Sequence, residues 1–211
     1  MKVCEIFASI QGESTYAGLP CIFVRMTGCN LRCKYCDTTY AYDQGSEMTV
    51  EDIIDAVRCF GFNLVEITGG EPLLQKDTGA LISLLLNMEF KVMVETNGSA
   101  DIGDIDRRAT IIMDVKTPGS GMSDSVRIEN IALLKKSDEL KFVITDKVDY
   151  DWACAMVRQF SLFGKCTVLF SPVYGKLEPL ELSKWIIADK LPVRINLQLH
   201  KYIYSPDQRG V

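Results

Sequence analysis

The feature that most restricts the fold of this chain is the regular alternation of two hydrophobic patterns along its 211 residues. Short runs of β-branched and other apolar residues are separated by segments in which apolar residues recur with helical spacing. Strands that alternate with helices predict a parallel sheet whose helices lie outside it. The expected strands are 21–26, 64–68, 90–95, 111–115, 140–145, 167–170 and 194–199.

The helical segments carry their own start and stop signals. Thr49-Val50-Glu51-Asp52 is an N-terminal capping sequence, and Gly61 is suited to end the helix that follows it. Pro179 is expected to open a further helix that runs to about Asp189. The expected apolar faces are Ile53, Val57 and Phe60 in the first helix, Leu81, Leu84, Leu85 and Met88 in the second, and Ile131 and Leu134 in a third.

The length of the chain is below the ~250 residues of a complete eight-fold barrel. We therefore expect one α/β domain over residues 1–211, folded as a partial or trimmed (β/α) TIM-like barrel. Ligands of such folds gather at the carboxyl ends of the strands. Polar residues cluster at those ends in four places, namely Arg25 and Thr27, Thr68 to Pro72, Glu95 to Gly98, and Asp114 to Lys116.

The last expected strand alternates between polar and apolar residues. Arg194, Asn196, Gln198 and His200 point one way, and the apolar residues between them point the other way. The polar set is expected to line the barrel interior while the apolar set packs on helices. The alternative is an edge strand with one solvated face.

Composition and charge exclude some classes of function. The net charge of −5 comes without a basic stripe, which argues against a general nucleic-acid binder. The N-terminus is not expected to be a signal peptide, and nothing in the sequence approaches the ~18 to 20 apolar residues of a membrane span. We expect a cytoplasmic protein with reduced thiols. Five of the eight cysteines lie in apolar segments and are expected to be small buried hydrophobes: Cys4, Cys21, Cys59, Cys154 and Cys166.

The other three cysteines, Cys29, Cys33 and Cys36, form a C-x3-C-x2-C pattern just after the first expected strand. Three thiolates this close can hold three irons of a cubane cluster and leave the fourth iron open to an exogenous amine and carboxylate. The alternative is structural zinc, which usually takes four protein ligands. Its fourth ligand would have to be another cysteine or His200, the single histidine.

This cysteine pattern, with Tyr35 before its last member, resembles the signature of the radical S-adenosylmethionine superfamily. Gly69-Gly70-Glu71-Pro72 resembles the GGEP motif of that superfamily, whose backbone and carboxylate meet the methionine amino group. Within the superfamily, the chain resembles the 7-carboxy-7-deazaguanine synthase family of queuosine biosynthesis. The segments that carry this resemblance are 7–13, 23–25, 28–31, 36–38, 95–98, 171–173 and 198–201. Ser14 departs from the usual glycine, and Asp114-Val115-Lys116 departs from the Ser-Pro-Lys of some members.

The resemblance implies a radical lyase that contracts the ring of 6-carboxy-5,6,7,8-tetrahydropterin to 7-carboxy-7-deazaguanine and releases ammonia. It implies three cofactors: a 4Fe–4S cluster, S-adenosylmethionine and Mg²⁺. It also implies an electron donor such as flavodoxin or ferredoxin, and a homodimer. No nucleic acid or membrane partner is expected. The protein is expected to orient the cofactors and to exclude side reactions.

The resemblance also implies three groups of site residues. The pterin would contact Ile10, Gln11, Gly12, Glu13, Arg25, Thr68, His200 and Val211, with Glu95 and His200 in catalytic positions. S-adenosylmethionine would contact Tyr35, Cys36, Asp37, Gly70, Asp114, Val115, Lys116, Ser171, Pro172, Val173 and Tyr174. Cys29, Cys33 and Cys36 would ligate the cluster, and Thr38 would bind Mg²⁺.

Taken singly, several of these residues have ordinary structural explanations. Arg25 could pair with an acidic neighbour, Thr68 could be a β-former, and residues 95–98 could form a turn. The C-terminal segment around Val211 could be a frayed end. Two other functions use parts of the same sequence: a glycyl-radical-enzyme activase, and a non-catalytic iron–sulfur or zinc-binding module.

Overall fold

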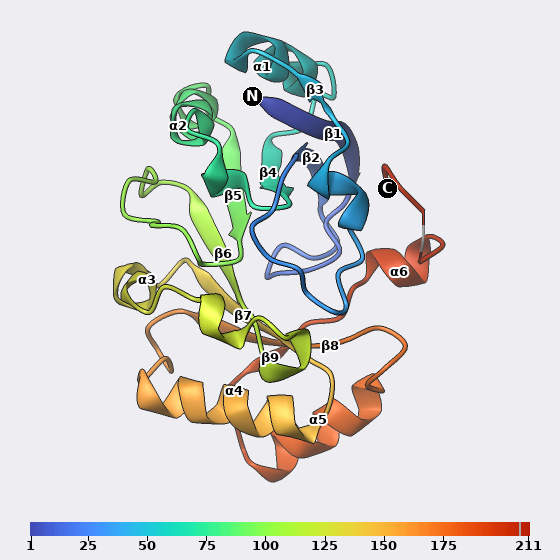
Figure 1. Cartoon of the computed structure of the whole chain (residues 1–211), viewed down its shortest axis with the longest axis vertical. Helices are drawn as coiled ribbons and strands as arrows, with labels where there is room; N and C mark the ends of the chain where they lie inside the picture. The colour runs from blue at the N-terminus through green and yellow to red at the C-terminus, as the bar shows by residue number, and fades with distance from the viewer. Residues whose placement is uncertain (207) are drawn as a thin grey trace.

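The computed structural model of the chain, which describes residues 1–206 and 208–211, contains one curved nine-stranded sheet with helices on its outer side (Figure 1). The strand order is β3-β1-β2-β4-β5-β6-β7-β8-β9. Neighbours from β2 to β9 are parallel, whereas β1 is antiparallel to both β2 and β3. The strands are β1 Lys2–Ile10, β2 Pro20–Met26, β3 Ser46–Glu47, β4 Leu64–Gly69, β5 Lys91–Thr96, β6 Thr110–Val115, β7 Glu139–Ile144, β8 Thr167–Pro172 and β9 Arg194–Ile195.

Helices cover the convex side of this sheet, and the main hydrophobic core lies between the two layers. The capping box predicted at Thr49 is present at the start of α1, with Ile53 and Val57 buried. On α2 the buried face is rotated from the prediction: Leu81 and Leu85 are buried but Leu84 is exposed. The helices are α1 Val50–Arg58, α2 Thr78–Asn87, α3 Glu129–Leu133, α4 Lys147–Gln159, α5 Pro179–Ala188 and α6 His200–Ile203.

The concave side of the sheet separates into an apolar layer and a polar layer. Phe23 and Met93 belong to a small second cluster of buried apolar residues, in which Phe7 stacks on Phe23 at 5.1 Å between ring centroids. Two residues further along these strands come Arg25 and Glu95, because alternate residues of a strand face the same side. The apolar layer therefore closes the bottom of the barrel, and polar groups lie above it, at the carboxyl ends of the strands.

The sheet is a partial barrel, as expected, and its seam is closed by loops. The backbone N–H of Leu199 donates to the carbonyl of Gly12 at 2.8 Å, and that of Ser14 donates to Asn196 Oδ1 at 2.8 Å. These contacts join the end of the chain to the loop after β1. Residues 12–14 and 196–199 thus form the wall that a further pair of strands would form in a complete barrel.

The prediction for residues 194–199 was wrong. The strand β9 covers Arg194–Ile195 alone, after which the chain turns inward and then forms α6. Asn196 is buried, as expected for the polar set, but Arg194 and Ile195 are exposed. After β9 the chain instead makes hydrogen bonds to the loop after β1, through Asn196 Oδ1 and the backbone N–H of Leu199.

The other expected strands appear within two residues of their predicted ends, but the prediction for the five apolar-segment cysteines was only partly right. Cys21 and Cys154 are buried as expected, Cys4 and Cys166 are half-buried, and Cys59 is exposed at the end of α1. The long helix α4 and the first strand β1 were not predicted. Among the described residues, no helix is long and apolar enough to cross a membrane.

Candidate active site

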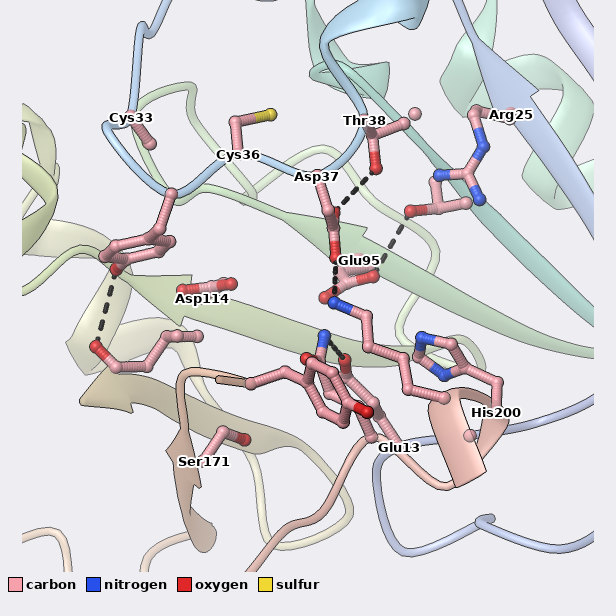
Figure 2. Close-up of a pocket in the computed structure, with 18 of the residues that line it drawn as sticks. Glu13, Arg25, Cys33, Cys36, Asp37, Thr38, Glu95, Asp114, Ser171 and His200 are labelled. Atoms are coloured by element: carbon pink, nitrogen blue, oxygen red, sulfur yellow. Dashed lines mark hydrogen bonds and ion pairs between the residues drawn. The ribbon is translucent and has the colours of Figure 1, made fainter. Parts of the chain in front are cut away.

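One cavity of about 810 Å³ opens at the carboxyl ends of the strands. Its lining comes from two regions, the cysteine loop on one side and the polar layer of the barrel on the other (Figure 2). The predicted site residues that line it are Ile10, Gln11, Gly12, Glu13, Arg25, Cys29, Cys33, Tyr35, Cys36, Asp37, Thr38, Thr68, Gly70, Glu95, Asp114, Lys116, Ser171, Pro172, Val173, Tyr174, His200 and Val211.

The predicted residue that the structure keeps out of this lining is Val115. Its side chain is fully buried in the main core beneath the helices. It alternates with Asp114, which faces the cavity, because successive side chains of a strand point to opposite faces. A contact from Val115 to a bound cofactor is therefore restricted to its backbone.

The cysteine loop is held above the cavity by backbone hydrogen bonds. The N–H of Gly28 donates to the carbonyl of Ala41 at 2.8 Å, and the N–H of Lys34 donates to the carbonyl of Ser120 at 3.0 Å. Leu31 is buried beneath the loop. All three thiols are free and partly exposed, and each lines the cavity.

The surroundings of the thiols fit an iron–sulfur cluster. Cys29 Sγ accepts hydrogen bonds from the backbone N–H of Leu31 at 3.4 Å and from Asn97 Nδ2 at 3.9 Å. Donors aimed at sulfur are one of the means by which proteins tune such clusters. Three cysteine thiols line this side of the cavity, whereas structural zinc usually takes four protein ligands.

The turn after β4 packs directly against the cysteine loop. A Cβ atom on Gly70 would overlap the carbonyl oxygen of Gly28 and the Cβ of Cys29, so only glycine allows this approach. The N–H of Glu71 donates to the same Gly28 carbonyl at 2.7 Å. Gly69 adopts φ +142° against the backbone of Met26. The turn therefore presents backbone to the cavity.

The expectation that the Glu71 carboxylate faces the cofactor is corrected by the structure. Glu71 is fully buried, and its carboxylate accepts hydrogen bonds from Leu73 N–H at 3.0 Å, Thr96 Oγ1 at 2.8 Å and Asn97 N–H at 2.7 Å. Burial raises the pKa of Glu71, and these hydrogen bonds lower it in part. Its role is to join the turn after β4 to the turn after β5.

The predicted cofactor contacts from β6 and β8 face the cavity with unused hydrogen-bonding capacity. Asp114 Oδ2 lies 3.0 Å from Lys116 Nζ, while Asp114 Oδ1 is buried without a hydrogen-bond partner among the described residues. An orphaned buried acceptor is costly unless a ligand donates to it. Ser171 Oγ accepts from Asn196 Nδ2 at 2.7 Å, and Tyr35 Oη donates to the Val143 carbonyl at 3.4 Å.

The predicted metal residue Thr38 lies beside a charged pair at the cavity mouth. Its hydroxyl donates to Asp37 Oδ1 at 2.9 Å, and Lys201 Nζ lies 2.6 Å from Asp37 Oδ2. Burial tends to raise the pKa of Asp37, but the charge of Lys201 and the hydrogen bonds from Lys201 and Thr38 together lower that pKa to about 2. The Thr38 hydroxyl is a hard oxygen donor at the cavity mouth, which suits a magnesium ion that keeps several waters.

The floor of the cavity holds Arg25 in a fixed orientation. Its Nε lies 2.8 Å from Glu5 Oε1, the pairing that the sequence left open, and the same oxygen accepts from Tyr40 Oη at 2.8 Å. Arg25 nevertheless lines the cavity. A guanidinium held from one side retains donors for a carboxylate on the other side.

Gln11 and His200 complete the wall at the seam. Gln11 Nε2 donates to Glu66, and Gln11 Oε1 accepts from the N–H of Glu13 at 3.0 Å, so the amide orientation is fixed. A Cβ on Gly12 would overlap the imidazole of His200. Burial lowers the pKa of His200, which favours the neutral imidazole, although the Glu13 carboxylate raises it in part.

Two charged residues of the floor, Glu66 and Lys141, were missed by the sequence interpretation. Both are almost fully buried and line the cavity. Burial, and then the charge of Glu95, raise the pKa of Glu66 well above its ordinary value. A charged residue inside an apolar strand run, as in Leu140-Lys141-Phe142, was the available signal.

The end of the chain lies over the cavity mouth. Val211 lines the cavity, and the Arg209 guanidinium stacks over the Tyr40 ring at 3.8 Å. Arg209 Nη1 also donates to Gln44 Oε1 at 3.1 Å. The tail is therefore held against the loop that follows the last cysteine, and the frayed-end alternative does not describe it.

A partial parallel barrel with three thiols and a glycine-rich turn at its carboxyl-end mouth defines the radical S-adenosylmethionine class. The Radical SAM superfamily model matches residues 23–116. Solved structures agree on the fold: a crystal structure of QueE from Escherichia coli superposes with a TM-score of 0.78 at 21% identity, covering 94% of each chain. SuiB from Streptococcus suis, bound to its precursor peptide SuiA, superposes with a TM-score of 0.61 at 18% identity, covering 82% of this chain and 47% of that one.

Two relatives are similar over the whole chain. The 7-carboxy-7-deazaguanine synthase of Chlorobaculum tepidum is 45% identical, covering 100% of this chain and 97% of the relative. The protein of the same name from Koribacter versatilis is 42% identical, covering 100% of both chains. The chain belongs to the 7-carboxy-7-deazaguanine synthase family.

Proposed function

We propose that this protein is a 7-carboxy-7-deazaguanine synthase, a radical S-adenosylmethionine lyase that converts 6-carboxy-5,6,7,8-tetrahydropterin to 7-carboxy-7-deazaguanine with release of ammonia. The cluster and S-adenosylmethionine, when bound, supply the hydrogen-atom abstraction that starts the rearrangement. The observation that carries this proposal is the single cavity in which the three thiols face the polar floor built around Arg25, Glu95 and Glu13.

Different residues of the cavity are proposed to bind different parts of the pterin. Arg25, held by Glu5, suits the carboxylate of the pterin, because a guanidinium matches a carboxylate with parallel hydrogen bonds. Gln11, Gly12 and Glu13 suit the donors and acceptors of the pterin ring edge. The neutral imidazole favoured at His200 can donate or accept a proton next to the substrate, and Glu95 offers a carboxylate across the cavity.

Magnesium is proposed to bind at Thr38 and the substrate together. A single protein hydroxyl holds the ion weakly, so substrate oxygens and waters must fill the rest of the octahedron. Asp37 is engaged with Lys201 and therefore suits a supporting role through the Thr38 hydroxyl. The pairing of metal and substrate at one residue makes their binding mutually dependent.

The remaining features are proposed from the family alone. The electron donor is proposed to be a flavodoxin or a ferredoxin, and the protein is proposed to be a homodimer. A reducing cytoplasm suits a chain whose eight cysteines are all free. Size-exclusion chromatography with light scattering tests the homodimer.

The deciding experiment is an anaerobic incubation of the reconstituted protein with the carboxylated tetrahydropterin, dithionite and S-adenosylmethionine. We expect 7-carboxy-7-deazaguanine and ammonia in equal amounts, detected by mass spectrometry and an ammonia assay. Reductive cleavage of S-adenosylmethionine without pterin turnover, and radical formation only with a partner protein, would instead indicate an activase. Neither cleavage nor turnover in a protein that binds metal would indicate a non-catalytic module.

A further inference from the structure

Lys141 is the most heavily paired cation of the described residues. Its side chain is 5% exposed, and its Nζ contacts three carboxylates. Nζ lies 2.8 Å from Glu13 Oε2 and 3.3 Å from Asp114 Oδ2, and it forms a third ion pair with Glu95. These carboxylates come from the loop after β1, from β5 and from β6. One buried ammonium thus connects three separate elements of the cavity.

The two carboxylates proposed to act on the substrate are held in the same way. Glu13 places one oxygen on Lys141 and accepts from Gln198 Nε2 at 2.9 Å with the other. Glu95 also places one oxygen on Lys141, and its second oxygen accepts from Thr68 Oγ1 at 3.2 Å. A carboxylate held at both oxygens keeps a fixed plane. The orientation of both groups therefore depends on the same ammonium.

The ammonium of Lys141 is largely committed to these carboxylates. Its Nζ donates hydrogen bonds to Glu13 and Glu95, and it forms an ion pair with Asp114 Oδ2 at 3.3 Å. Removing the charge would leave three neighbouring carboxylates without their shared cation, and like charges at short distance repel and favour the uptake of a proton. If Glu13 and Glu95 were protonated or displaced, their carboxylates could no longer accept hydrogen bonds from the substrate in the orientation that Lys141 holds.

We infer that Lys141 is a positioning residue that orients Glu13 and Glu95 together, so that pterin binding and turnover both depend on one buried ammonium. This inference rests on the proposed function, since it takes the roles of Glu13 and Glu95 from it. Asp114 retains its second partner, Lys116 at 3.0 Å, so the cofactor side depends less on Lys141.

The test uses the full-length protein with its cluster reconstituted, and compares wild type with Lys141→Met. We expect the dissociation constant for 6-carboxy-5,6,7,8-tetrahydropterin to be at least tenfold higher than that of the wild type, and the kcat to be at least tenfold lower. The affinity for S-adenosylmethionine should change less than threefold. The matched control is Lys135→Met, which removes a partly buried lysine that pairs with Asp138 outside the cavity. This control should retain the pterin affinity and the kcat of the wild type.

A double-mutant comparison separates positioning from a general structural role. If Lys141 acts through Glu13, the fold-loss of pterin affinity in Lys141→Met/Glu13→Gln should be at least threefold smaller than the product of the two single losses. Losses that multiply independently, or a lowered melting temperature with wild-type affinity and kcat, would overturn the inference. If Lys141→Met does not fold, Lys141→Arg takes its place in the test, because it keeps the positive charge but replaces the compact ammonium with a planar guanidinium. A tenfold fall in its kcat/KM supports the inference, and a wild-type value overturns it.

The same data distinguish this inference from the function on which it rests. A wild-type protein that neither binds nor converts the pterin contradicts the proposed function, whatever Lys141 does. A wild-type protein that converts the pterin, together with a Lys141→Met variant that matches it, leaves the proposed function intact and overturns the role of Lys141.

Discussion

The two sides of the cavity are built by different means. The cysteine side is held by main-chain hydrogen bonds and by the glycine backbone of Gly70, where a Cβ atom would collide with the Gly28 carbonyl. The barrel side is held by side-chain ion pairs and hydrogen bonds, with Arg25 on Glu5 and Lys141 on three carboxylates. A site held by backbone tolerates loss of a single side chain without losing its shape, whereas a site held by charge pairs does not.

The largest effect is expected from Cys36→Ala, which tests the cysteine side. The variant should lose the stable 4Fe–4S cluster and all turnover while the fold persists, because one loop loses one ligand and no backbone contact. Iron and sulfide analysis after anaerobic reconstitution, with circular dichroism, measures both. Cys154→Ala removes a buried thiol outside the cavity and should retain the cluster and activity. A full cluster in Cys36→Ala would contradict the ligand assignment.

The next effect is expected from Arg25→Met on the barrel side. Methionine keeps much of the length but removes every donor, so pterin binding should weaken by about 2–3 kcal/mol through loss of a charge-assisted pair. Isothermal titration under anaerobic conditions measures the affinity. Arg108→Met, which removes an arginine paired with Asp106 on the surface, is the control and should bind as wild type. Equal pterin affinity in Arg25→Met and wild type would remove Arg25 from the substrate site.

A third test examines the protonation of Glu66, on the barrel side, through the pH dependence of the free energy of unfolding. The pKa of Glu66 is raised in the folded state, above its ordinary value of 4.5. Above pH 4.5 the folded state therefore holds a proton that the unfolded state has released, and the free energy of unfolding falls as pH rises toward the folded pKa. Glu66→Gln carries no such proton, so its stability relative to wild type should increase with pH in this window, by at most ~1.4 kcal/mol per pH unit.

Urea unfolding of Glu66→Gln and wild type at several pH values between 5 and 8 gives this difference directly. Other titrating groups are shared by the two proteins, so most of their contributions cancel in the comparison. A stability difference that is constant across the range would mean that Glu66 is ionised in the folded protein and that the buried network carries one more negative charge.

The smallest effect is expected from Thr38→Val, at the boundary between the two sides. Valine keeps the shape but deletes the hydroxyl, so the strengthening of pterin binding by Mg²⁺ should fall several-fold with the cluster unchanged. The measurement is the pterin dissociation constant with and without Mg²⁺. Thr39→Val, one residue along, should keep the full magnesium dependence. If wild type shows no such dependence, or Thr38→Val shows the same one, Thr38 is a loop residue.

The sequence predicted the strands and the gathering of polar residues well, because both depend on local periodicity and on the rule that parallel strands end at one edge. It did not predict where single side chains point. Glu71 turns into the protein because its hydrogen-bond partners come from the turn after β5. Val115 turns into the core because it alternates with Asp114 along β6, which the resemblance to the family did not take into account. Lys141 and Glu66 were missed because burial of a charge is decided by partners far along the chain.

The failure at residues 194–199 has the same origin. Alternating polarity predicted a strand, but only the loop after β1 determines that the chain turns inward at Asn196. No local pattern records that partner. The helix α4 was missed for a different reason: its buried face includes a charged residue, Asp149, next to Tyr150, so the apolar periodicity is interrupted.

The loop-closed seam has a consequence for the order in which the protein assembles. Ser14 and Asn196 are 182 residues apart in the chain, so their contact is among those of greatest sequence separation and is expected to form late in folding. During translation, β2 to β8 and the cysteine loop emerge long before residue 196 leaves the ribosome. The wall formed by residues 12–14 and 196–199 is therefore expected to be the last part of the cavity to be completed.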